Sequence, residues 1–164
     1  MKKRFFIIIG IIILIVLVVI GGCFMFLKRN VVIKDISYFS LLVTEGIAVN
    51  DNYHYQLYFE NEKIIASYKP YGKNETITVE VEKEILSRLE DILNRYQVRK
   101  WKGYYKNNRS VLDGGSFSFQ IRYLENKEIY AHGYMKYPKN YKEVVHEIRE
   151  LYREVFPEDE LFES

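Results

Sequence analysis

The pattern of hydrophobic and polar positions divides the chain into one uninterrupted apolar run and a longer part in which both kinds of residue are mixed. The run, residues 5–27, holds 23 residues without a charged or strongly polar side chain. At about 1.5 Å per residue, a helix of this length is roughly 35 Å long, against a bilayer hydrocarbon core of about 30 Å. The pattern therefore predicts a transmembrane helix, and residues 1–29 are expected to form a membrane anchor.

Six stretches of the remaining chain predict strands. The clearest alternation of apolar and polar side chains lies in residues 53–60 and 116–123, where the period of two marks a half-buried strand. Residues 53–60 and 63–69 are expected to form one hairpin, and residues 116–123 and 129–136 a second one. The expected strands are residues 36–43, 53–60, 63–69, 76–81, 116–123 and 129–136.

Two segments have the helical period instead. Residues 82–97 place Ile85, Leu89 and Ile92 on one face, and a final helix begins after Asn140 and ends before Pro157. The order is strand, hairpin, strand, helix, hairpin, helix. It predicts an α+β fold in which a layer of antiparallel strands packs against two helices. This extracytoplasmic domain is expected to span residues 30–156, and residues 157–164 form an acidic tail.

The positive charge of the chain belongs to its anchor. The whole chain has a formal net charge of +2, but its first 29 residues carry five Lys and Arg and no acidic residue. The remainder has 19 basic and 22 acidic residues, so it is slightly acidic and nucleic acid is not an expected partner. The basic residues before the apolar run outnumber those directly after it, which favours a cytoplasmic N-terminus and a C-terminal domain outside the cell membrane.

Cys23 leaves two interpretations of the anchor open. The residues Ile20, Gly21, Gly22 and Cys23 look like a lipoprotein signal, in which the chain is cleaved before a lipidated cysteine. The apolar residues that follow Cys23 favour an uncleaved single-pass helix instead. Because Cys23 is the only cysteine, the chain has no internal disulfide and no cysteine-based metal cluster.

The segment of residues 98–115 contains the only tryptophan, Trp101, beside several basic residues and tyrosines. Together with residues further on, it resembles a group of uncharacterised small lipoproteins and membrane-anchored proteins of Gram-positive bacteria. The resemblance covers roughly residues 50–155 and implies an extracytoplasmic domain without implying an activity. The matching residues are Trp101, Gly103, Tyr104, Val111, Leu112, Asp113, Gly114, Ser116, Phe117, Gly133, Tyr134, Pro138, Asn140 and Tyr141.

Four residues are candidates for a binding site: Trp101, Tyr104, Asp113 and His132. The competing interpretation makes Trp101 a plug in the core beneath its loop and Asp113 a turn residue that accepts backbone hydrogen bonds. A groove that gathers Trp101, Asp113 and His132 would favour the binding site. The chain also holds 15 tyrosines and 10 phenylalanines, which either cover a sheet face or form a platform for a carbohydrate or peptide.

No catalytic constellation is recognisable. The three histidines are isolated, and the chain lacks a nucleophile elbow, a phosphate-binding loop and a dinucleotide fingerprint. No cofactor, metal or catalytic residue is therefore expected, and the protein is not expected to be an enzyme. The prediction is a membrane-anchored protein that binds an unknown protein or envelope polymer. The alternative is a cell-envelope enzyme or inhibitor-like domain that acts on wall or peptide substrates.

Overall fold

The computed structural model describes residues 32–45, 52–70, 73–108, 110–111 and 114–156. The chain divides into two units between Val32 and Ile33, and the fold below is that of the second. The predicted anchor with Cys23, the turn residue Asp113 and the acidic tail lie outside the described residues. Among the residues that are described, no helix has the length and apolar character needed to cross a membrane.

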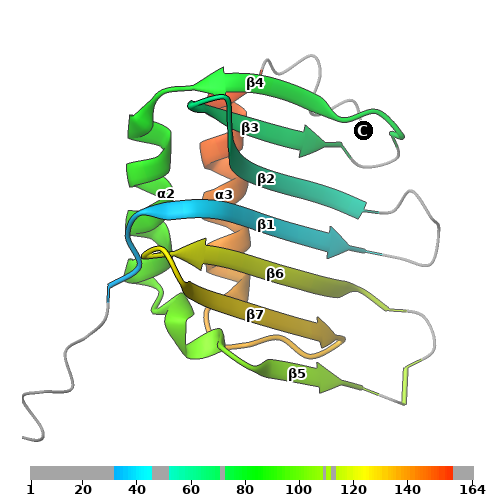
Figure 1. The fold of residues 1–164 in the computed structure, drawn as a ribbon. Helices are drawn as coiled ribbons and strands as arrows, with labels where there is room; N and C mark the ends of the chain where they lie inside the picture. The colour runs from blue at the N-terminus through cyan, green and yellow to red at the C-terminus, as the bar shows by residue number, and fades with distance from the viewer. Residues whose placement is uncertain (1–31, 46–51, 71–72, 109, 112–113, 157–164) are drawn as a thin grey trace, which may run out of the picture. The chain divides into compact units, whose positions relative to one another are not determined.

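Seven strands form one sheet in the order β4-β3-β2-β1-β6-β7-β5 (Figure 1). Consecutive strands β1 to β4 occupy one half of the sheet, and β1 joins them to β6 in the other half. The strands are β1 (Ile36–Thr44), β2 (Asn52–Glu60), β3 (Lys63–Lys69), β4 (Ile77–Val81), β5 (Tyr104–Asn107), β6 (Ser116–Tyr123) and β7 (Lys127–Tyr134). Both predicted hairpins are present, because β2 pairs with β3 and β6 with β7 in antiparallel register.

The α+β prediction is confirmed, but the prediction of an antiparallel layer is wrong at one edge. β5 was not predicted, and it pairs with β7 in parallel. Its four residues, Tyr-Tyr-Lys-Asn, are too few and too polar to show an alternating pattern. The strand forms because the 3₁₀ helix Val98–Trp101 leads the chain to the free edge of β7, where Gly103 donates its N–H to the carbonyl oxygen of Tyr130.

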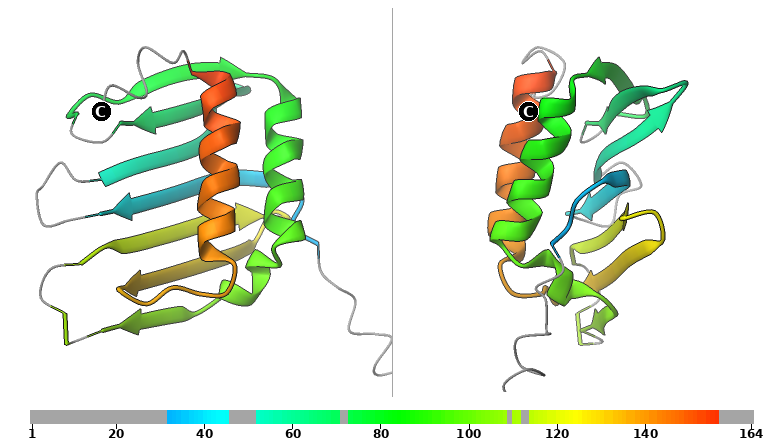
Figure 2. Two further views of the ribbon diagram at one scale, coloured as in Figure 1. Left: turned by 180° about the vertical axis from the view of Figure 1, so that it is seen from behind. Right: turned by 60° about the vertical axis from the view of Figure 1, so that its left-hand side comes forward.

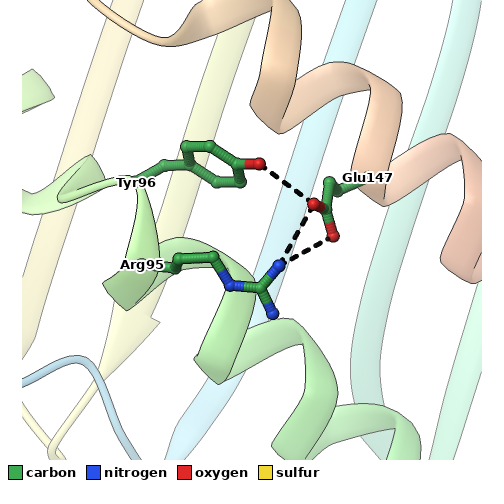
Figure 3. A network of polar contacts seen from close by, with 3 residues as sticks. All are labelled: Arg95, Tyr96 and Glu147. Carbon is green, nitrogen blue, oxygen red and sulfur yellow. Dashed lines mark hydrogen bonds and ion pairs between the residues drawn. The ribbon is translucent and has the colours of Figure 1, made fainter.

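Both helices, α2 (Lys83–Arg95) and α3 (Tyr141–Val155), lie on the same face of the sheet and run across its strands (Figure 2). Arg88 pairs with Glu154 and the later Arg95 pairs with the earlier Glu147, so the two helices are antiparallel. At the other end, Glu147 accepts hydrogen bonds from Arg95 and Tyr96 (Figure 3). The two Arg–Glu pairs are solvent-exposed and set the alignment of the helices more than their stability.

The core lies between the helices and the sheet. Every second residue of the central strands is buried towards the helices, including Phe39, Leu41, Leu57, Phe119 and Ile121, each at most 1% exposed. The helices contribute the apolar stripes that their sequences predict. These are Leu86, Leu89, Ile92 and Leu93 from α2, and Val144, Ile148, Leu151 and Tyr152 from α3. Burial of these apolar surfaces is the main favourable contribution to folding.

Candidate binding surface

The opposite face of the sheet carries no helix in the described part of the chain (Figures 1 and 2). The residues that point to this face alternate with the core residues of each strand, and the register places them in rows across the sheet. We call this surface the open face and define it by its two central rows. The first row is Tyr130, Gln120, Ser40, Gln56, Ser67 and Thr78, and the second is Tyr105, His132, Ser118, Leu42, His54 and Lys69.

Tyrosine side chains stand at the β5–β7 end of the open face. Tyr105 is 67% exposed and Tyr130 is 49% exposed. The ring of Tyr105 lies 5.3 Å from that of His132, with 31° between the ring planes. Because a parallel β5 brings Tyr105 beside His132, this aromatic pair exists only through the edge strand that the sequence pattern did not reveal.

The middle of the open face is polar and hydrogen-bonded. The Ser40 hydroxyl lies 2.9 Å from Nε2 of His54, and Nε2 of Gln56 donates to the Tyr38 hydroxyl across 3.3 Å. Burial, and secondarily the charge of Lys69, lowers the pKa of His54 below its ordinary value. The imidazole is therefore neutral at pH 7, and the centre of the face presents neutral donors and acceptors.

Charged residues are confined to the margins of the open face. Lys69 is the one charged member of the two central rows, at the β3 end. In the next row, the guanidinium of Arg122 lies over the ring of Tyr38, 4.6 Å from its centroid. Near the β4 edge of the sheet, Lys63 forms an ion pair with Glu80, with 2.6 Å between Nζ and Oε2. The described residues thus place no row of unpaired cations on this face.

Trp101 and Tyr104 lie on the helix side of the sheet, away from the open face. The Trp101 ring is 2% exposed, packs 5.3 Å from the ring of Phe119, and donates from Nε1 to the carbonyl oxygen of Lys139. Of the two interpretations of Trp101, the burial of its ring against Phe117 and Phe119 favours the plug in the core. Trp101 and Tyr104 together border a pocket of about 190 Å³.

His132 is on the other side of the sheet from Trp101. Its strand neighbours Ala131 and Gly133 face the core, whereas His132 faces outwards with Tyr105. The structure therefore brings Trp101 together with Tyr104 and leaves His132 apart from both, while Asp113 lies outside the described residues. The sequence pattern does not single out Tyr105, Tyr130 and His54 as surface candidates. The sequence shows the alternation of polar and apolar residues in β2 and β6. It does not show the strand pairing that aligns their polar residues into rows.

Two further observations limit what the site can be. No three His, Cys, Asp or Glu side chains within the described ranges are grouped so that they could hold a metal ion. No known family model matches the chain, and a search of curated proteins finds no match either. The geometry of the described residues is consequently the main basis for a functional interpretation.

Proposed function

We propose that this is a non-enzymatic binding protein, held at the cell membrane by residues 5–27, whose open face binds a neutral glycan chain of the cell envelope. The observation that carries the proposal is the open face itself: neutral hydrogen-bonding groups across the centre of the sheet, with exposed tyrosine rings at one end. The proposal makes the protein an anchored receptor for polysaccharide and assigns it no chemical step.

A neutral sugar chain matches this surface in two ways. The apolar C–H face of a pyranose ring packs against an aromatic ring, and Tyr105 and Tyr130 expose such rings. Sugar hydroxyl groups both donate and accept hydrogen bonds, as does the hydroxyl of Ser118 in the second row. In the first row, the amide nitrogen of Gln120 already donates to Glu128, and its amide oxygen can accept from a sugar hydroxyl. A sheet face that binds oligosaccharides has a precedent in the five-stranded OB-fold barrels.

Other polymers match the open face less well. A nucleic acid or other polyanion requires Lys and Arg along its path, whereas Lys63 is already paired and Arg122 lies over a tyrosine. The core of a protein–protein interface is mainly apolar, but Leu42 is the single aliphatic side chain in the two central rows. Charge and polarity thus favour a neutral, hydroxyl-rich ligand.

The test is binding of a defined neutral oligosaccharide, the hexamer of N-acetylglucosamine, to the full chain in detergent micelles, measured by calorimetry. We expect the double substitution Tyr105→Ala with Tyr130→Ala to weaken binding roughly ten- to a hundredfold, because each ring contact contributes about 0.5–1.5 kcal/mol. Phe59→Ala is the matched control, since Phe59 is 48% exposed on the same sheet but points to the helix side.

Either of two results would contradict the glycan proposal. One is a wild-type protein that binds neither the hexamer nor particles of insoluble chitin and cellulose. The other is a loss of binding in Phe59→Ala that equals the loss in the tyrosine variant, because exposed aromatic area alone would then explain it. Capture of an envelope protein by the open face, lost in the tyrosine variant, would replace the glycan with a protein partner.

The membrane location is a separate prediction. The basic residues before residue 5 favour a C-terminal domain outside the cytoplasm. Alkaline phosphatase folds actively only outside the cytoplasm, so its fusion to the C-terminus is expected to be active. A β-galactosidase fusion at the same position is the control, and its activity in place of the phosphatase would reverse the orientation.

A further inference from the structure

Two glutamines occupy equivalent positions in the first row of the open face. Gln120 on β6 and Gln56 on β2 both pair with Ser40 of β1, which stands between them. The amide nitrogen of Gln120 donates to Glu128 across 2.6 Å, and that of Gln56 donates to the Tyr38 hydroxyl across 3.3 Å. Both side chains are partly exposed, and neither amide oxygen accepts a hydrogen bond from the described residues. The row therefore presents two oriented acceptors.

The distance between the two glutamines matches the repeat of one kind of sugar chain. Neighbouring strands lie about 4.8 Å apart, so Gln120 and Gln56 are separated by about 9.6 Å across the sheet. An extended β-1,4-linked chain of pyranose sugars advances by nearly one strand spacing per sugar. Successive sugars are turned over, so a given hydroxyl returns to the same edge of the chain at every second sugar. The spacing of the glutamines is therefore that of a disaccharide unit.

A chain of this kind can follow the row across the strands. The strands of a twisted sheet rotate about an axis that runs across them, so the row stays straight while its face turns by about 20–25° at each strand. Rotation about the glycosidic bonds lets a β-1,4-linked chain turn with the face. An α-1,4-linked chain coils instead, so its successive sugars do not stay on one face of the sheet.

Burial sets the length of the row that a ligand can reach. At one end, Tyr105 on β5 and Tyr130 on β7 are exposed. At the other end, Ser67 on β3 follows Gln56 in the row and is only 3% exposed, so it interrupts the accessible contacts. Five consecutive strands, β5, β7, β6, β1 and β2, thus offer one contact each.

We propose that the ligand of the open face is an extended β-1,4-linked glycan that lies across the strands, with one sugar on each of these five strands. The first two sugars pack on Tyr105 and Tyr130. The third and fifth donate the same hydroxyl to the amide oxygens of Gln120 and Gln56, and the fourth lies turned over on Ser40. This ligand class rests on the glycan function proposed above and adds to it the linkage, the direction and the length of the chain.

The first experiment measures how affinity depends on the length and linkage of the sugar chain. β-1,4-linked oligomers of N-acetylglucosamine, from the dimer to the hexamer, are titrated into the full chain in detergent micelles and followed by calorimetry. We expect the affinity to rise up to the pentamer and the hexamer to bind about as tightly. Cellohexaose and maltohexaose are the matched pair, because they differ only in β-1,4 against α-1,4 linkage. Maltohexaose is expected to bind about tenfold more weakly or worse, since it loses both hydrogen bonds to the glutamines.

The second experiment separates the two glutamines. Gln56→Met is expected to weaken binding of the pentamer about three- to tenfold and to leave the trimer unchanged, because a trimer held on the tyrosines ends at Gln120. Gln120→Met is expected to weaken both oligomers. Tyr38→Phe is the matched control, since it removes the partner of the Gln56 nitrogen and keeps the acceptor oxygen. Thr78→Val, beyond Ser67 in the same row, is a second control. Both controls are expected to bind both oligomers as the wild type does.

Three results would overturn the β-1,4-linked ligand while a glycan still binds, so that the proposed function stands. They are equal binding of cellohexaose and maltohexaose, a pentamer that binds no more tightly than the trimer, and a Gln56→Met variant that binds the pentamer like the wild type. An equal loss of trimer and pentamer binding in Gln56→Met also contradicts it, because retained trimer binding is the sign of an intact fold. A wild-type protein that binds no oligomer of the series contradicts both the ligand class and the glycan function.

Discussion

Trp101→Ala is expected to lower the free energy of unfolding by about 3–5 kcal/mol, the range found for large aromatic residues truncated in cores. The ring is 2% exposed and contacts Phe117, Phe119 and Tyr141, so its removal leaves a cavity bounded by both the sheet and α3. It also leaves the carbonyl oxygen of Lys139 without its donor. Urea denaturation of the full chain in micelles, followed by circular dichroism, measures the change.

Trp101→Phe is the control for this prediction. It keeps most of the apolar volume and removes the hydrogen bond to Lys139, which by itself contributes about 1 kcal/mol. We expect its unfolding midpoint to lie between those of the wild type and Trp101→Ala. An unfolding midpoint of Trp101→Ala equal to that of the wild type would mean that the ring is exposed in solution and available for binding.

Gly133→Ala is expected to be the second most damaging substitution, with a loss of about 3 kcal/mol from overpacking. A Cβ atom at this position would lie 2.1 Å from the carbonyl oxygen of Lys136 and 2.6 Å from Cε1 of Phe117. The first neighbour is backbone and the second is a buried ring, so neither can move without disturbing the core. The same denaturation experiment gives the free-energy change.

Gly103→Ala separates steric overlap from backbone strain. Gly103 has a φ of 74°, and a Cβ there would meet nothing within 4 Å. Its cost is therefore limited to the left-handed conformation, about 1–2 kcal/mol. If Gly103→Ala destabilised the fold more than Gly133→Ala, the close approach of β7 to the chain at Lys136 would not be a feature of the molecule in solution.

The spacing of apolar residues along the chain locates most of the strands and helices, because these same residues form the core. In β6, Phe117, Phe119 and Ile121 alternate with polar residues. Because these three residues are buried, they fix which face of the strand turns towards the core. In α2, Leu86, Leu89 and Leu93 mark the buried stripe in the same way. Segments that bury one regular face can be identified from sequence because the pattern and the packing have the same physical cause.

The end of α2 does not follow from the spacing of apolar residues. The helical pattern was predicted to extend through residue 97, but Gln97 has a φ of 56° and the chain continues as a 3₁₀ turn towards β5. Asn140 adopts a left-handed conformation as well and donates from its side chain to the carbonyl oxygen of Tyr96. The end of α2 and the start of α3 are thus joined by a hydrogen bond between residues 44 positions apart in the sequence. A local sequence pattern does not contain this contact.

By itself, the sequence determined the apolar run, the α+β class and both hairpins, since each follows from local periodicity; for Trp101 it left a binding site and a core plug both open. Only the tertiary structure decided that β5 joins in parallel, that His132 faces away from Trp101, and that Gln120 and Gln56 stand in one row. The physical reason is that strand order and register bring distant residues together, and these depend on the free energy of the whole packed domain rather than on any one segment.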